Sequence, residues 1–466
     1  MCCFEDLRPY LDALTPDEKA SFRMTVDGIA TGTDMITSTG ISEVITASQI
    51  ARSLTADFTE ESEAAAAVFY TKRYFETLPL GQGLVATELQ PADDFALLAG
   101  QAFVSAWDLS HDRSYLEKAT VVLDFAAARS KYKYQMRILL VKVLRLLGSP
   151  SLALKHFRIL DVKSVQFDTL SHVILSRATT FAVGHDPALS EEVASAQKWY
   201  KAGESEASEM PVRAFSYGNY SKIEDFAEFQ ERLSGSLSKQ LLSLESVRMQ
   251  AVVGSLDPVA GTKAVLDLAR TLNGPDRSSD NRDFKTLPSL QPATQRQIRE
   301  QTQMGPETRI AWLRAMVAIY VNFLEPSSSG AFEANLDLYT SELTSSESAL
   351  LTFSGLARAA LSTRLEAPEA ETSALIFFKE QESRFIQAAE DTATLPWELL
   401  HIAEISLEGF CLLDLAVDQK IAEITAAKPT DHLNADHLMS HAYNVVDSRK
   451  TMAEALGSAL HKRCSK

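Results

Sequence analysis

The segment from Tyr132 to Phe181 constrains the fold most, because it predicts three successive helices joined by short turns. A strongly apolar helix is expected over residues 134–147, and a glycine follows it. Ser149-Pro150 then begins a second helix, since proline is favoured at the first helical position and glycine just after a helix end. A third helix is expected over residues 166–182. Short helices in direct succession are typical of an α-solenoid.

The remainder of the chain also favours helix and offers no convincing strand. Glycine (19) and proline (16) are scarce among the 466 residues, and both disfavour helix interiors. Period-2 alternation bounded by turn residues is hard to find. We therefore predict an all-α fold, a helical-repeat α-solenoid whose tetratricopeptide-like repeats are degenerate, because no clean repeat of about 34 residues is present. A compact helical bundle is the alternative.

A polar break divides the chain. Residues 273–305 are rich in Asn, Asp, Ser, Pro and Gln, a composition that predicts a long ordered loop or a linker. The predicted organisation is a helical-repeat region over 1–272, this loop or linker over 273–305, and a C-terminal helical region over 306–466. A capping box at Ser221 is expected to open a helix from Ile223.

The three-helix segment carries an unusual charge. Residues 129–177 hold ten basic and two acidic residues, a net charge of +8, whereas the whole chain carries −17. This asymmetry predicts docking to a negatively charged partner, such as an acidic protein surface or ribosomal RNA. An ordinary packed helix, whose basic side chains cover apolar surface with their stems, is the competing interpretation. The candidate partner-binding residues lie in and just before the first helix: Lys131, Lys133, Arg137, Lys142 and Arg145.

Catalytic and cofactor-binding motifs are missing from the sequence. Two segments resemble the acetyl-CoA pyrophosphate loop of acetyltransferases, but Leu78 stands where Gln or Arg belongs in 78–83, and Leu237 would block close backbone approach in 232–237. Neither P-loop nor GxSxG elbow occurs. We therefore predict that the chain is not an enzyme, with no catalytic residue and no cofactor site of its own.

The sequence also bears on metal binding and on the cellular compartment of the protein. His437 and His441 are one helical turn apart and follow His432, but Leu438 stands where HExxH has its glutamate. Surface or capping histidines are the simpler interpretation, so no metal site is predicted. Four cysteines without a CxxC pair favour a reducing compartment. With no secretory signal and no bilayer-length apolar run, the expected location is the cytoplasm.

Several segments of the chain follow one another in an order and spacing that are typical of one protein family. The clearest follow Leu147-Gly148 and read LALKHF, DVKSVQ and DTLSH, where the family has L-A-L-x-H-[FY], [DN]-[VI]-K-x-[IV]-Q and D-T-L-x-H. They lie at Leu152–Phe157, Asp161–Gln166 and Asp168–His172, and flanking pieces agree at Cys2–Leu7 (CCFEDL), Thr87-Glu88, Ala92–Asp94, Tyr217-Gly218 and Asp280–Phe284. With these pieces the chain resembles the auxiliary, non-catalytic subunit of the NatB N-terminal acetyltransferase complex, over most of the chain from Cys2 to about Phe284 and more weakly beyond.

The resemblance implies a helical superhelix that wraps a small catalytic subunit. That subunit would bind acetyl-CoA and acetylate Met-Asp, Met-Glu, Met-Asn and Met-Gln N-termini during translation, and this chain would help locate it at the ribosome. Neither membrane nor DNA is an expected partner. Family members usually have further repeats before the CCFEDL segment, so we expect this chain to be the C-terminal portion of the family's chain or a short form. A generic α-solenoid scaffold of another cytosolic assembly is the alternative.

Overall fold

Every regular element in the described part of the chain is helical, as the all-α prediction expects. The computed structural model describes residues 4–32, 37–55, 57–85, 88–184, 187–274, 278–292, 294–326, 340–362 and 368–427. Two compact units are formed, residues 1–162 with 283–303, and residues 163–282 with 304–466. The predicted repeats, and the predicted division at residues 272 and 305, stay predictions.

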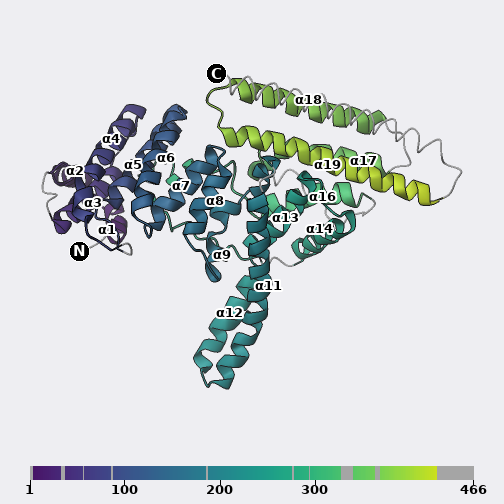
Figure 1. Cartoon of the computed structure of the whole chain (residues 1–466), viewed down its shortest axis with the longest axis horizontal. Helices are drawn as coiled ribbons and strands as arrows, with labels where there is room; N and C mark the ends of the chain where they lie inside the picture. The colour runs from purple at the N-terminus through teal and green to yellow at the C-terminus, as the bar shows by residue number, and fades with distance from the viewer. Residues whose placement is uncertain are drawn as a thin grey trace. The chain divides into compact units, whose positions relative to one another are not determined.

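The first unit is a series of helices in which α2 packs against α3, and each helix from α4 to α8 packs against the next (Figure 1). Its central helix, α5, is buried along most of its length and lies between α4 and α6. At Gly100 of α5 a Cβ atom would lie 2.8 Å from a methyl carbon of Leu123 in α6, so glycine permits this close approach. The helices are α1 (Phe4–Asp12), α2 (Pro16–Ala30), α3 (Ser38–Ser53), α4 (Glu60–Thr77), α5 (Asp93–Ser110), α6 (Ser114–Arg129), α7 (Tyr134–Leu146), α8 (Pro150–Ile159) and the short α15 (Ile298–Gln301), with the 3-10 turn η1 (Leu78–Gly81).

Part of the polar segment 273–305 packs against helices of the first unit. Its portion 283–303 belongs to the first unit and packs against α5. The side-chain amide of Gln101 donates to the carbonyl of Pro288 at 2.8 Å and accepts from the amide of Leu290 at 3.2 Å. Such bonds replace the backbone partners that an irregular segment lacks.

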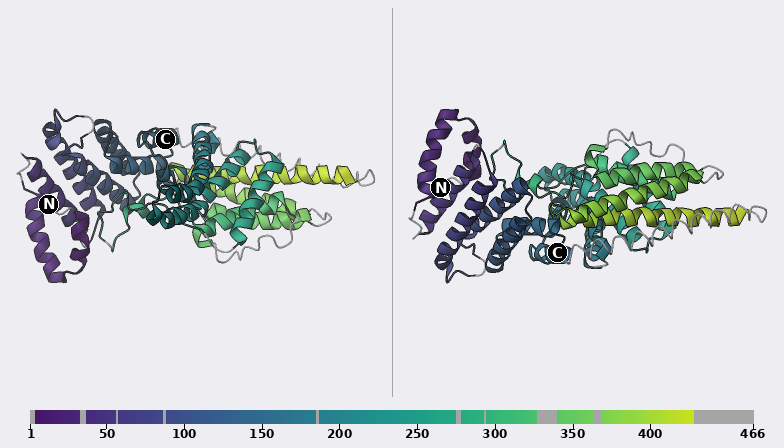
Figure 2. Two further views of the ribbon diagram at one scale, coloured as in Figure 1. Left: turned by 90° about the horizontal axis from the view of Figure 1, so that it is seen from below. Right: turned by 90° about the horizontal axis from the view of Figure 1, so that it is seen from above.

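The second unit surrounds an apolar helix, α16, most of whose side chains are buried. In Figure 2 the long helices α18 and α19 run beside α17 around this core. The elements are α9 (Val165–Leu170), α10 (His172–Leu175), η2 (Ala178–Gly184), α11 (Pro187–Ser216), η3 (Tyr220–Lys222), α12 (Ile223–Ser234), α13 (Leu237–Val252), α14 (Pro258–Asn273), α16 (Ile310–Leu324), η5 (Thr340–Glu342), α17 (Ser345–Ser362), α18 (Pro368–Glu390) and α19 (Pro396–Ala427).

A buried ionic cluster joins three of these helices. Arg248 of α13, only 1% exposed, donates to Glu408 of α19 at 2.8 Å, to Glu404 at 3.0 Å and to Glu245 at 2.7 Å. Tyr320 of α16 donates its hydroxyl to Glu408 at 2.6 Å. Burial raises the pKa of Glu404 and of Glu408 to about 7, because one guanidinium cannot neutralise three desolvated carboxylates.

A second buried pair lies beside this cluster. The guanidinium of Arg177 contacts both carboxylate oxygens of Glu347, at 3.0 and 3.2 Å, and donates to the carbonyl of Met304 at 2.8 Å. Trp312 donates its indole N–H to Glu347 at 2.9 Å. Burial opposes the charge of Glu347, but the adjacent Arg177 guanidinium holds the pKa of that carboxyl well below its usual range.

The predicted helices at residues 134–147 and from Ser149-Pro150 are confirmed as α7 and α8, but the third is wrong. Residues 166–182 instead form α9, α10 and η2. Arg177 adopts a left-handed conformation with φ of 48°, which interrupts the helix and sends its guanidinium to Glu347. The helix from Ile223 is confirmed as α12, yet its cap position is Lys222, and Ser221 lies in the preceding η3.

Arg248→Met tests how far the second unit depends on the ionic cluster. We expect a loss of about 3–5 kcal/mol, because three glutamates would remain buried without their cation. The urea midpoint, followed by tryptophan fluorescence to which buried Trp312 contributes, measures the loss. Arg213→Met removes an exposed ion pair with Glu209 and should cost less than about 1 kcal/mol. Equal urea midpoints for the two variants would contradict the view that the stability of the second unit depends on the buried ionic cluster.

Candidate partner-binding groove

A groove in the first unit collects segments that are far apart in the sequence. Its volume is about 450 Å³, and its walls come from α1, α3, the start of α5, the start of α7 and the loop at 288–290. The lining residues are Phe4, Ser42, Ile45, Thr46, Gln49, Leu89, Gln90, Pro91, Asp94, Leu97, Lys133, Gln135, Pro288 and Leu290. Apolar side chains mixed with a few polar groups suit contact with another polypeptide.

One ion pair crosses the groove lining. Lys133 Nζ lies 2.7 Å from Asp94 Oδ1, and the two side chains are 12% and 33% exposed. The lysine therefore presents little free positive charge, since its nearest anion neutralises it within the groove. A partner that enters here meets a polar pair beside apolar side chains, not a basic patch.

Asp93 fixes the wall behind this pair. Its carboxylate is buried and accepts from the Ser130 hydroxyl at 2.5 Å and from the Gln90 amide at 3.1 Å. Burial raises the pKa of Asp93 to about 6, although these donors and the nearby Lys133 oppose the rise. The start of α5 is thereby tied to the turn that precedes α7.

The structure brings together only some of the predicted partner-binding residues. Lys131 is exposed, Lys133 lines the groove, and Lys142 is half-buried. Arg137 and Arg145 are only 4% and 5% exposed, so neither can meet a partner unless α7 moves. Arg137 and Arg145 are therefore packed side chains, as the competing interpretation expects. Docking through the three lysines stays a prediction.

Arg137 has a structural task at the end of α6. Its guanidinium donates to the carbonyls of Ala127 and Lys131, which no helical amide satisfies there, and to Nδ1 of His156 at 3.3 Å. Because a guanidinium only donates, Nδ1 must accept, and Nε2–H of His156 is left to donate to Asp124 at 3.2 Å. Burial lowers the pKa of His156, which favours this neutral form.

Two exposed cations were not singled out from the sequence. Lys155 and Arg158 lie on the outer face of α8, opposite buried Ala153, Leu154 and Phe157. The helical period of that apolar face is visible in the sequence and could have identified them. Phe4 and Leu290, in contrast, reach the groove through tertiary packing that no local pattern signals.

Motif residues of the second unit are structural anchors. Asp168 is buried and accepts hydrogen bonds from Tyr200 at 2.7 Å, from Asn281 at 2.8 Å and from Ser236. Two segments singled out in the sequence, 168–172 and 280–284, therefore meet at one carboxylate. A buried acceptor satisfied by three donors holds elements together and offers nothing to a ligand.

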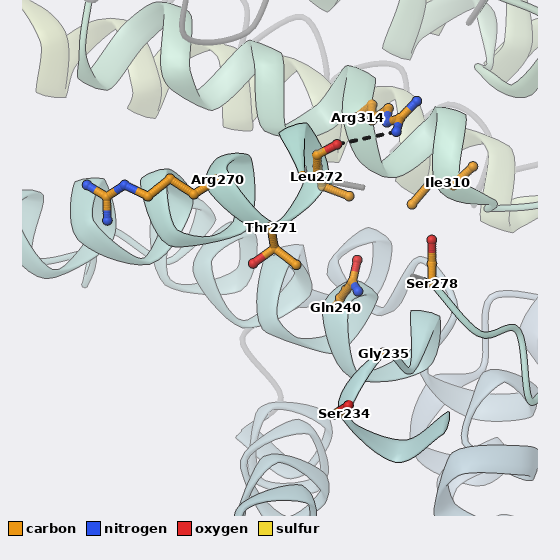
Figure 3. A pocket seen from close by; sticks show the side chains of 10 residues that line it. Ser234, Gly235, Gln240, Arg270, Thr271, Leu272, Ser278, Ile310 and Arg314 are labelled. Carbon is orange, nitrogen blue, oxygen red and sulfur yellow. Dashed lines mark hydrogen bonds between the residues drawn. The ribbon is translucent and has the colours of Figure 1, made fainter. Parts of the chain in front are cut away.

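A second hollow, of about 460 Å³, lies in the second unit (Figure 3). Arg314 at its edge donates to the carbonyl of Leu272 at 3.3 Å, and Arg270 points away to Asp267. Its lining includes no buried charged side chain. We therefore place the candidate site in the first unit, where Phe4 and Asp94 of the singled-out segments line a groove.

Among the described residues, no group of three or more His, Cys, Asp or Glu side chains could hold a metal ion. None of the helices described is long and apolar enough to cross a bilayer. His432, His437 and His441 lie outside the described residues, as do Cys2 and Cys3.

Comparison with known proteins gives a consistent result. Residues 1–284 match the family model described as the N-acetyltransferase B complex (NatB) non catalytic subunit. The chain is 25% identical over 337 residues to the human N-alpha-acetyltransferase 25, NatB auxiliary subunit, a match that covers 67% of this chain and 33% of that protein. It is 27% identical over 346 residues to the N-terminal acetyltransferase B complex subunit arm1 of Schizosaccharomyces pombe, covering 71% and 40%.

Solved structures agree on the fold. The chain superimposes on a chain of the NatB acetyltransferase complex bound to CoA and MES with a TM-score of 0.61 and 14% identity, over 98% of this chain and 61% of that one. A complex bound to a bisubstrate inhibitor gives 0.60 and 12% identity, over 99% and 73%. The chain spans about a third of the length of the human relative that it matches.

Asp93→Asn tests the raised pKa beside the groove. Because the folded-state pKa of about 6 exceeds the ordinary 3.8, folding favours the protonated acid, and Asp93 contributes less stability as pH rises from about 4 to about 6. The variant cannot titrate, so it should gain stability relative to the wild type across that window and keep a constant difference above pH 7. Urea midpoints of both proteins from pH 4.5 to 7.5 measure this. A difference independent of pH would contradict it.

Proposed function

Since the chain belongs to the family of the non-catalytic NatB subunit, we propose that it is a scaffold that binds and positions a catalytic N-terminal acetyltransferase subunit. The observation that carries the proposal is the family match over residues 1–284, which includes every lining helix of the groove. The loop at 288–290, just beyond the match, completes the lining. The catalytic subunit is proposed to insert a polypeptide segment into this groove.

The proposed activity resides in the complex, not in this chain. Acetyl-CoA would bind to the catalytic subunit, and the complex would acetylate Met-Asp, Met-Glu, Met-Asn and Met-Gln N-termini during translation. This chain would need no cofactor of its own. The sequence motifs support the proposal, because the acetyl-CoA loops at 78–83 and 232–237 are both incomplete.

We also propose a finer description of the fold. The helices of residues 1–272 would be degenerate tetratricopeptide-like repeats of an α-solenoid, followed by the loop at 273–305 and the helical region at 306–466. Consecutive packing of α4 with α5, α5 with α6, α6 with α7 and α7 with α8 supports this description. A solenoid is stabilised by such nearest-neighbour interfaces.

We propose that the chain acts at the cytosolic ribosome. Lys131 and the half-buried Lys142 remain candidates for contact with ribosomal RNA, and Lys155 and Arg158 on α8 extend the basic set. Phosphates are recognised by accessible Lys and Arg, so buried Arg137 and Arg145 are left out of this proposal.

A pull-down of the 466-residue chain with its cognate catalytic subunit, followed by acetylation of a Met-Asp peptide, tests the scaffold role. We expect a stable complex and activity. Gln49→Arg, which fills the groove from α3, should weaken the complex at least about tenfold, because a displaced contact of about 1.4 kcal/mol is sufficient. Gln250→Arg, on an exposed position of α13, should not. No complex from a well-folded chain would refute the proposal, and binding unaffected by Gln49→Arg would move the site elsewhere.

Ribosome co-sedimentation tests the basic surface. Lys131→Glu combined with Lys155→Glu should release the chain from ribosomes at a lower salt concentration than the wild type, because phosphate contacts make binding salt-dependent. Lys198→Glu combined with Lys263→Glu changes the charge equally at exposed positions of the second unit. Identical salt profiles for both double variants would contradict ribosome docking through this surface.

A further inference from the structure

The helices α11 and α12 form a hairpin whose end carries large exposed side chains. Figure 1 shows the hairpin extending away from the other helices of the second unit. Four apolar or aromatic residues near its turn, which we call the aromatic tip, are strongly exposed: Val212 (66%), Phe215 (64%), Tyr217 (86%) and Tyr220 (62%). Single exposed apolar residues are ordinary, but a group of them on a projecting turn marks an interaction surface.

The tip is built rigidly. The turn closes α11 with two hydrogen bonds, from the Asn219 amide to the Ala214 carbonyl at 2.8 Å and from the Gly218 amide to the Phe215 carbonyl at 3.1 Å. Gly218 has φ of 69°, the left-handed conformation that such a helix end requires. Phe215 and Tyr220 meet edge to face with ring centres 5.5 Å apart. The rings of Phe215 and Tyr220 therefore support each other although they are exposed, which reduces the entropy that these two side chains lose on binding.

An acidic face adjoins the tip. Glu224, Glu228 and Glu231 are exposed and follow the i, i+4, i+7 spacing that places them on one side of α12, opposite buried Leu233. Glu228 pairs with Arg232 at 2.6 Å, whereas Glu224 and Glu231 form no ion pair with a described residue. We call these three residues the acidic face.

The charge of the hairpin selects the kind of partner. Residues 201–232 contain seven acidic and four basic residues, a net charge of −3. Three of the four cations are paired with a neighbour on their own helix: Arg213 with Glu209, Lys222 with Asp225, and Arg232 with Glu228. This field repels nucleic acid and anionic bilayers, and it attracts a cationic polypeptide.

We propose that the aromatic tip and the acidic face together form a docking surface for an arginine-rich polypeptide segment. A guanidinium can stack on a Phe or Tyr ring and also bond a carboxylate through two parallel hydrogen bonds, and lysine can do neither as well. The tip supplies the rings, and Glu224 and Glu231 supply carboxylates that form no ion pair with any described residue. This surface shares no residue with the groove of the first unit. Its test therefore does not depend on whether the catalytic subunit binds to that groove.

The test uses the full chain and a short labelled peptide of alternating arginine and alanine, with binding followed by fluorescence anisotropy. Phe215→Ala combined with Tyr217→Ala should weaken binding about tenfold, since two exposed cation–ring contacts of about 0.5–1 kcal/mol each are lost. Tyr10→Ala combined with Phe22→Ala removes two exposed aromatic residues of the first unit and should change the affinity less than about twofold. The lysine–alanine peptide should bind more weakly than the arginine peptide.

The second part of the test neutralises the charge of the acidic face. Glu224→Gln, Glu228→Gln and Glu231→Gln together should weaken binding more than Glu61→Gln, Glu76→Gln and Glu117→Gln, which remove the same charge from exposed positions of the first unit. Circular dichroism should show equal folding of all variants. Equal weakening by both triple variants would mean attraction to the net charge alone and would overturn the proposal, as would no binding. Self-association of the chain that Phe215→Ala abolishes would also overturn it, because the tip would then be an interface between copies.

Discussion

The interaction on which the second unit depends is the buried contact of Arg248 with Glu245, Glu404 and Glu408. A cation and its carboxylates can leave water only when their geometry satisfies nearly every donor and acceptor, so the contact fixes how α13 and α19 meet. The phenol of Tyr320 adds α16 to the same cluster. Apolar side chains around it could pack in several registers, whereas charged groups that must meet allow very few.

The two units use charge in different ways. In the first unit, Lys133 and Asp94 neutralise each other within the groove, and Arg137 donates its hydrogen bonds to carbonyl groups at the end of α6. The second unit buries Arg177 against Glu347, and its Glu224 and Glu231 are exposed on α12 without an ion pair to any described residue. A groove with balanced charge and an acidic hairpin would attract chemically different partners, which is a useful property for a scaffold.

The charge count of residues 129–177 overstates the basic surface. Of its ten cations, Arg137, Arg145 and Arg177 are buried, each at 5% exposure or less. Sequence composition counts a buried arginine and an exposed one alike, and arginine tolerates burial because its five donors can satisfy several carbonyls or carboxylates together. The basic positions on the outer face of α8 could have been recognised from the helical period, but the burial of Arg137 depends on carbonyls that α6 supplies.

The sequence by itself determined the class of the fold, the helices α7 and α8 and the family, because those follow from local propensity, from helix-end residues and from motifs in order. The glycine after α7 and the proline that begins α8 needed no tertiary information. Only the tertiary structure decided that residues 166–182 break at Arg177, that the loop 283–303 joins the first unit, and that Phe4, Asp94 and Leu290 line one groove. Several of these outcomes depend on partners more than a hundred residues away in the sequence. A local sequence pattern does not show which distant residues will meet, so it cannot predict the stabilisation that such contacts provide.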